Sequence, residues 1–65
     1  MTIVLNGEER TVSSTTISEL VKELGYDGKV IAVASNEVFV SRSSYDETEL
    51  KEGDSIEVVS PMQGG

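Results

Sequence analysis

Apolar and polar side chains alternate at the start of the chain, as they do in a strand that buries one face. Within 2–6, Ile3 and Leu5 share one face of the expected strand. The dipeptide Asn6-Gly7 follows, which is the strongest short-range signal for a two-residue hairpin turn. We therefore expect the chain to turn back there and to form a second strand over 10–12.

The pattern then changes to the period of a helix. Thr16 and Glu19 fit a capping box, in which the Thr16 hydroxyl caps an amide of the first turn and the Glu19 carboxylate reaches back to the amide of Thr16. Gly25 stands where a left-handed residue ends a helix. Between these signals, apolar residues recur at i, i+3, i+4 and i+7, namely Ile17, Leu20, Val21 and Leu24. The spacing predicts one short amphipathic helix with one face to bury.

Two strands are expected soon after the helix. The run 30–34 is continuously apolar, as is typical of an inner strand that is at least partly covered on both faces. We expect Ile31 and Val33 to face the helix. A turn at 36–37 then leads into a short strand over 38–40.

The last part of the chain is expected to close the sheet. Segment 45–50 is expected to form a helical turn or a loop, with Leu50 inserted into the core. A turn at 52–54 precedes a closing strand over 55–59, whose inward-facing residues are Ile56 and Val58.

This order of elements predicts a fold class. Strand, strand, helix, strand, short strand and strand make an α+β architecture, the ubiquitin-like β-grasp, with a mixed sheet of about four to five strands and one main helix packed across it. The first and last strands are expected to be central and parallel. We expect one β-grasp domain over 1–60, followed by a flexible C-terminal tail over 61–65.

Composition narrows the possible chemistry. The 65 residues include no Cys and no His, which removes disulfides, thiolate nucleophiles and the usual zinc ligands. The chain also has no phosphate-binding loop and no nucleophile paired with a base. We expect a protein that is not an enzyme and that binds no cofactor or metal. With no apolar run that could span a membrane and no signal-peptide pattern, a cytoplasmic location is expected.

The charge is strongly acidic, with 5 Lys and Arg against 12 Asp and Glu, a formal net charge of −7. Such a surface repels phosphate backbones, so nucleic acid is not an expected partner. The acidic residues either keep the protein soluble or dock on a basic patch of a partner. Arg42, one of the few basic residues, pairs either with an acidic group of a partner or internally with Asp46 or Glu47.

The sequence ends in Gly64-Gly65, a pair that chance would place at two given positions in roughly 0.5% of chains, given a glycine usage of about 7%. A carboxylate is a poor electrophile, so acyl transfer requires its conversion with ATP to an acyl adenylate, from which a sulfur nucleophile displaces AMP. Gly65 has no side chain to crowd its carbonyl, and Gly64 lets a tail thread a narrow channel. The alternative is a frayed terminus without function.

These residues resemble the ThiS family, the sulfur carriers of thiazole synthesis for thiamine, over the whole chain. The resemblance implies that an E1-like adenylating enzyme activates Gly65 with ATP, that a sulfur donor system converts it to a thiocarboxylate, and that thiazole synthase uses the sulfur. It also implies that Gly64 is needed for entry to both active sites. Ser35, Ser41 and Tyr45 differ from the residues that are common in the family. These differences affect packing and do not touch the tail. The most specific matching segments are 3–8, 16–24, 33–38, 42–45, 50–54 and Gln63-Gly64-Gly65.

An enzyme that handles the tail must also recognise the body of its carrier, and exposed apolar residues are candidates for this docking. Scattered apolar surface residues are also normal without any such role. Three other functions stay open: sulfur carriage for molybdopterin synthesis, a ubiquitin-like interaction module that is never activated, and conjugation to a lysine of another protein. The docking candidates are Val4, Phe39, Val59, Met62 and Gln63.

Overall fold

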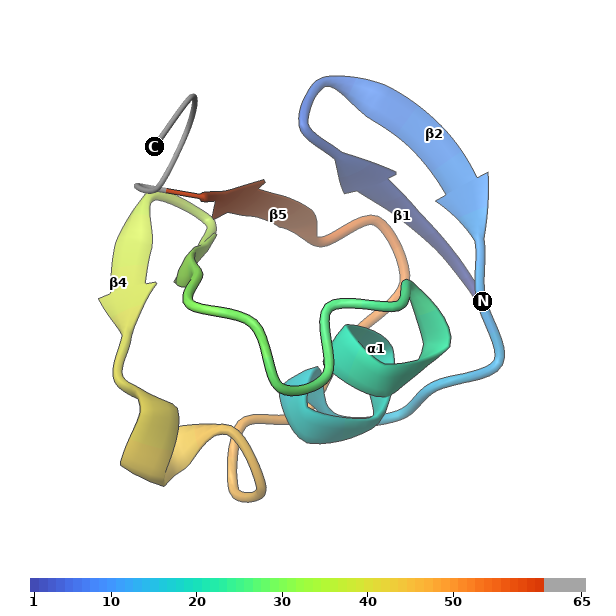
Figure 1. Ribbon diagram of the computed structural model, residues 1–65. Helices are drawn as coiled ribbons and strands as arrows, with labels where there is room; N and C mark the ends of the chain where they lie inside the picture. Colours follow the sequence, from blue (N-terminus) through green and yellow to red (C-terminus); the bar gives the residue numbers. More distant parts are fainter. Residues whose placement is uncertain (61–65) are drawn as a thin grey trace.

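The structure is a computed structural model that describes residues 1–60 (Figure 1). The expected flexible tail over 61–65 lies outside the described residues. The described elements, in chain order, are β1 (Thr2–Leu5), β2 (Glu8–Thr11), α1 (Ile17–Glu23), β3 (Ala32–Ser35), β4 (Val38–Val40), the 3-10 helix η1 (Arg42–Ser44) and β5 (Ser55–Val59).

The five strands form one mixed sheet in the order β2-β1-β5-β3-β4. β1 and β5 are parallel, whereas the other neighbouring pairs are antiparallel. α1 lies across one face, on the concave side of the curled sheet (Figure 1). The predicted β-grasp, with parallel first and last strands inside the sheet, is confirmed.

The opening hairpin is tighter than predicted. Asn6 and Gly7 have φ values of 51° and 86°, the left-handed conformations that a two-residue turn with the twist of the flanking strands requires. The turn therefore closes directly on the pair Leu5 and Glu8, and β2 begins at Glu8 rather than at residue 10. Val12 follows β2 and is buried in the core.

The helix begins and ends at its sequence signals. The Thr16 hydroxyl accepts a hydrogen bond from the amide of Glu19 at 3.2 Å, as predicted. The reciprocal bond differs, because the Glu19 carboxylate accepts from the amide of Thr15, at 2.8 Å, and not from that of Thr16. The Thr15 hydroxyl donates to the same oxygen at 3.1 Å, so this position offers the carboxylate two donors.

A Schellman motif ends α1. Gly25, with a φ of 83°, donates from its amide to the carbonyl of Lys22 at 3.1 Å, and the amide of Tyr26 reaches the carbonyl of Val21 at 2.9 Å. The reversal sends the chain from the end of α1 into the loop that leads back to the sheet.

The core lies between α1 and the inner face of the sheet. Leu50 is only 5% exposed, so its predicted place in the core is confirmed, and Val58 is buried as expected. The largest fully buried side chains are Ile3, Ile17, Leu20, Val33 and Ile56. Each lies at a position that the period of two or of 3.6 assigns to the inner face.

The beginning of β3 was predicted wrongly. β3 begins at Ala32, which pairs with Val59 at the end of β5; residues before Ala32 have no such partner in the ladder, and Val30 is 60% exposed. The helical turn or loop expected over 45–50 is observed as a turn and loop. The 3-10 helix η1, in which the amide of Tyr45 donates to the carbonyl of Arg42 at 3.2 Å, precedes it.

Candidate functional site

The sheet face that α1 does not cover carries a group of apolar side chains. In the register, Ala32 pairs with Val59, and Ala34 pairs with Phe39. Phe39 is 68% exposed and Val59 is 59% exposed, while the two alanines between them are half-buried. We call these four residues on three adjacent strands the outer apolar patch.

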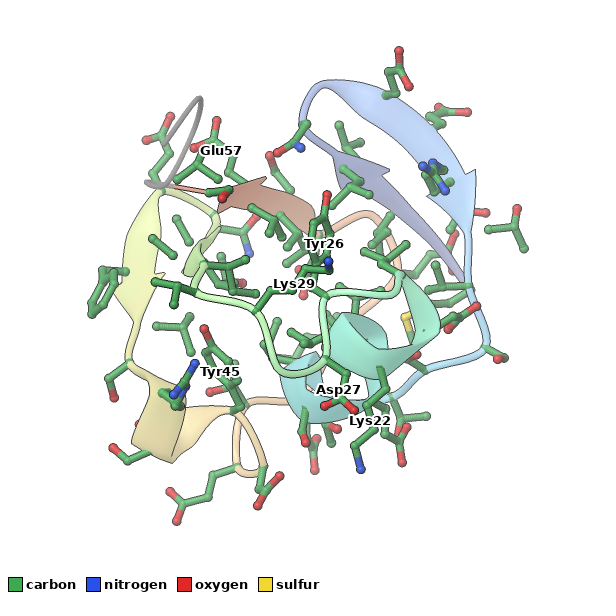
Figure 2. All side chains as sticks on the ribbon, in the orientation of Figure 1. Lys22, Tyr26, Asp27, Lys29, Tyr45 and Glu57 are labelled. Atoms are coloured by element: carbon green, nitrogen blue, oxygen red, sulfur yellow. The ribbon has the colours of Figure 1, made fainter. Side chains whose placement is uncertain are left out.

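Glu57 borders the outer apolar patch. It pairs with Ala34 across β3 and β5, so its carboxylate lies on the same sheet face (Figure 2). Contiguous exposed apolar residues beside a charged rim are typical of surfaces that meet another protein. The patch reaches the last strand residue, Val59, after which the chain continues toward Gly64 and Gly65.

The structure brings only some of the docking candidates together. Phe39 and Val59 share the outer apolar patch. Val4 lies on the same sheet face but on β1, where its strand partners are Glu9 and Ser55, and it is half-buried. Val4 lies beside Ser55 at the beginning of β5, so the polar outer residues Ser55 and Glu57 separate it from Val59 and the patch. The remaining site candidates, Met62, Gln63, Gly64 and Gly65, lie outside the described residues.

Two asparagines fix β5 along its two flanks. The side chain of Asn6 is hydrogen-bonded to both backbone polar groups of Val58, and the side chain of Asn36 accepts from the amide of Ser55 at 3.0 Å. Both asparagines have left-handed φ values, 51° and 52°. The sequence predicted them only as turn residues. Their role in holding β5 could have been inferred from the residue type, because the side-chain amide of Asn can take the place of a peptide unit.

The carboxylates with perturbed pKa values belong to the helix side of the molecule. The Ser14 hydroxyl donates to Glu23, and together with the amides of Ser13 and Ser14 it holds the pKa of Glu23 below its usual range. Donation from the amide and then the hydroxyl of Thr15 lowers the pKa of Glu19. These bonds join α1 to the loop before it, so we assign them a structural role.

Residues 1–60 contain neither a candidate metal site nor a candidate membrane-spanning helix. No group of three or more Asp and Glu in this part of the chain could hold a metal ion. No helix there is long and apolar enough to cross a membrane.

Comparisons with known proteins give the family. The sequence profile of the ThiS family matches residues 3–65. The sulfur carrier protein ThiS of Thermus thermophilus is 39% identical over 61 residues, which are 94% of this chain and 95% of that protein. The crystal structure of the thiamine biosynthesis protein ThiS from Geobacter metallireducens has a TM-score of 0.84 and 29% identity, with both chains covered completely.

The fold and these matches define a ubiquitin-like β-grasp protein in which one helix packs on a five-stranded mixed sheet. The chain belongs to the ThiS family.

Longer relatives contain the same segment. Two proteins named thiazole synthase, from Paramagnetospirillum magneticum and Magnetococcus marinus, are 42% and 41% identical to this chain over 66 residues. All of this chain is matched, but it spans only 20% of the length of each of those proteins.

Proposed function

We propose that this chain is a sulfur carrier of thiamine biosynthesis and that Gly65 carries the sulfur as a thiocarboxylate. The observation that supports this most is the match along 95% of the Thermus sulfur carrier, together with a family match that runs through Gly64 to Gly65. The chain acts as a substrate of other enzymes. It uses no bound cofactor or metal of its own.

The chemistry proceeds by activation and displacement. A carboxylate oxygen of Gly65 attacks the α-phosphate of ATP on an E1-like adenylating enzyme, and pyrophosphate leaves. Sulfide delivered by the donor system then attacks the acyl adenylate at its carbonyl carbon, and AMP leaves. The resulting thiocarboxylate passes its sulfur, at the oxidation level of sulfide, to the acceptor. An oxygen from water or from a carbonyl of the acceptor takes the place of the sulfur on the acyl carbon, which regenerates the carboxylate. Gly64, without a side chain, allows the tail to enter both active sites.

Thiazole synthase is the proposed acceptor enzyme. In two proteins named thiazole synthase, a segment similar to this whole chain forms part of the same polypeptide. Joining a carrier to its acceptor raises the effective concentration of the transferable group at the active site. This observation favours the thiazole pathway over molybdopterin synthesis, over lysine conjugation and over a module that is never activated.

The body of the carrier is proposed to dock through the outer apolar patch. Phe39 and Val59 supply its exposed apolar area, and Met62 and Gln63 follow within a few residues of Val59. Val4 is proposed at the margin, because Ser55 and Glu57 of β5 lie between it and Val59. We propose the cytoplasm as the compartment, where ATP is available to the activating enzyme.

Reconstitution with purified enzymes tests the proposal. The carrier is incubated with its E1-like enzyme, ATP and a sulfur donor, and is then offered to thiazole synthase or to molybdopterin synthase. We expect sulfur transfer to the thiazole product and none from a chain that lacks Gly65. Transfer only to the molybdopterin precursor would reject the pathway, and full function without Gly65 would reject the carrier mechanism.

A further inference from the structure

A hollow of about 280 Å³ opens on the helix side of the molecule, away from the outer apolar patch. It lies between α1, the loop that follows α1, and the segment formed by η1 and Tyr45. Figure 2 shows Tyr26, Asp27 and Lys29 on that loop, with Tyr45 from the turn after η1. Its apolar and aromatic lining consists of Val21, Tyr26, Ile31 and Tyr45.

The hollow concentrates the positive charge of an acidic protein. Of the five basic residues in the chain, three line it: Lys22, Lys29 and Arg42. Its one acidic lining residue is Asp27, so the residues that line the hollow carry a net charge of +2. The rest of the chain has two basic residues, Arg10 and Lys51, and eleven acidic ones. A charge of opposite sign to the rest of the surface marks this hollow as the place where an anionic group is attracted.

Arg42 is directed toward the loop after α1. Its Nη2 donates to the carbonyl of Lys29 at 3.4 Å, so the guanidinium reaches across one side of the hollow. The sequence left open whether Arg42 pairs internally with Asp46 or Glu47 or meets an acidic partner. The observed acceptor is the neutral carbonyl of Lys29, so this hydrogen bond does not neutralise the guanidinium charge.

We propose that this hollow docks an acidic segment of a partner protein, with an apolar or aromatic side chain of that segment on the floor and its carboxylates beside Lys22, Lys29 and Arg42. All three cations are exposed, so each ionic contact is individually weak and screened by salt. Several carboxylates spaced along a peptide suit such a rim better than one small anion. The half-buried Tyr26 and Tyr45 offer amphipathic contact area at low entropic cost.

The position of the hollow gives the docking a role distinct from the proposed tail chemistry. α1 and the sheet separate it from the outer apolar patch, so a partner held in the hollow leaves that face, including Val59, accessible. An acidic segment can thus hold the carrier while another enzyme handles the tail. Binding in the hollow does not require a reactive Gly65, so this inference can fail while the carrier mechanism stands.

The test is an NMR titration of the full ¹⁵N-labelled chain with the synthetic peptide Glu-Glu-Leu-Tyr-Glu-Glu. The double variant Lys29→Gln with Arg42→Gln is compared with a charge-matched control, Arg10→Gln with Lys51→Gln, in which both substitutions lie outside the hollow. We expect saturable chemical-shift changes around Tyr26 and Tyr45. The affinity for the peptide should fall by roughly fivefold in the first variant but by less than about twofold in the second. Raising the salt concentration should also weaken the binding.

Several outcomes would overturn the proposal. Equal weakening in the two variants would mean that the peptide responds only to net charge. Saturable shifts with AMP or inorganic phosphate, and none with the peptide, would assign the hollow to a small anion. Absence of saturable peptide binding at low salt would show that the hollow is not a docking site.

Discussion

The side-chain amide of Asn6 is hydrogen-bonded to both backbone polar groups of Val58. Asn6 Oδ1 accepts from the Val58 amide at 2.9 Å, and Asn6 Nδ2 donates to the Val58 carbonyl at 3.2 Å. The Asn6 backbone amide meanwhile donates to the carbonyl of Ile56 at 2.9 Å. The side chain therefore continues the ladder between β1 and β5 after the backbone of β1 has turned away into the hairpin.

Replacing Asn6 with glycine should loosen the end of β5 without straining the turn. Glycine accepts the left-handed backbone at this position, so the substitution removes mainly the two side-chain bonds. We expect a loss of about 1–2 kcal/mol in the free energy of unfolding and faster hydrogen exchange at the Val58 amide. Chemical denaturation and exchange measured by NMR check both effects.

Asn36→Gly is the matched control, because Asn36 also has a left-handed φ but bonds the amide of Ser55 at the other end of β5. It should speed exchange at Ser55 and leave Val58 protected. Unchanged protection of Val58 in the Asn6 variant would show that the side-chain bridge does not hold the strand.

Ile56→Ala should destabilise the fold strongly. Ile56 is fully buried beneath α1, and truncating such a side chain costs about 2–5 kcal/mol because the cavity closes only partly. Val59→Ala, on the same strand but 59% exposed, should change the free energy of unfolding by less than about 0.5 kcal/mol. Urea titrations of the two variants measure the difference, and similar midpoints would contradict the assigned register of β5.

The contacts of Glu23 predict a loss of stability in acid. Its pKa is lowered in the folded protein by the Ser14 hydroxyl and by the amides of Ser13 and Ser14, so the carboxylate binds its proton less readily than in the unfolded chain. This contribution is fully present above the unfolded pKa, roughly 4.3, and is lost as the pH falls through the lower folded pKa.

Glu23→Gln should therefore lower stability at neutral pH and flatten the acid limb of a stability profile measured by denaturation between neutral and acidic pH. Glu8→Gln removes the same charge from β2 without touching Ser13 or Ser14, and it serves as the control. An acid limb that is equally steep in Glu23→Gln and the parent protein would exclude this contact as a cause of acid sensitivity.

Much of the fold followed from the sequence because local and long-range signals agree. The period of α1, its Thr16 cap and the Gly25 ending are encoded within neighbouring residues, and all three are observed. The beginning of β3 was predicted wrongly because it depends on where β5 ends, which is a long-range pairing. The same reason explains why Val30 was expected in a strand and is exposed.

The site was predictable only in part. The inward-facing residues expected along β5 left Val59 as an exposed candidate, and Phe39 was named as an apolar residue of a short strand, but their neighbourhood depends on the strand order across the sheet. The register of β1 with β5 places Val4 beside Ser55, away from Val59. The hollow on the helix side could not be predicted from the sequence, because its basic residues come from three separate segments that only the folded chain brings together.

Docking through the outer apolar patch predicts a selective effect on activation. Phe39→Ser should raise the KM of the E1-like enzyme for the carrier by roughly tenfold, as loss of an apolar interface anchor does, with little change in kcat. Val38→Ser is the control, because Val38 is 65% exposed on the same short strand but faces the other side of the sheet. Equal effects of the two substitutions on KM would contradict docking through this face.

Intact-mass spectrometry tests the central claim most directly. The untagged full chain is incubated with the E1-like enzyme, ATP and a sulfur donor, beside a chain that lacks Gly65. The account predicts that the full chain gains the mass difference between sulfur and oxygen and that the shortened chain does not. No adenylate and no thiocarboxylate, with an enzyme shown to be active on another carrier, would contradict sulfur carriage and favour an interaction module that is never activated.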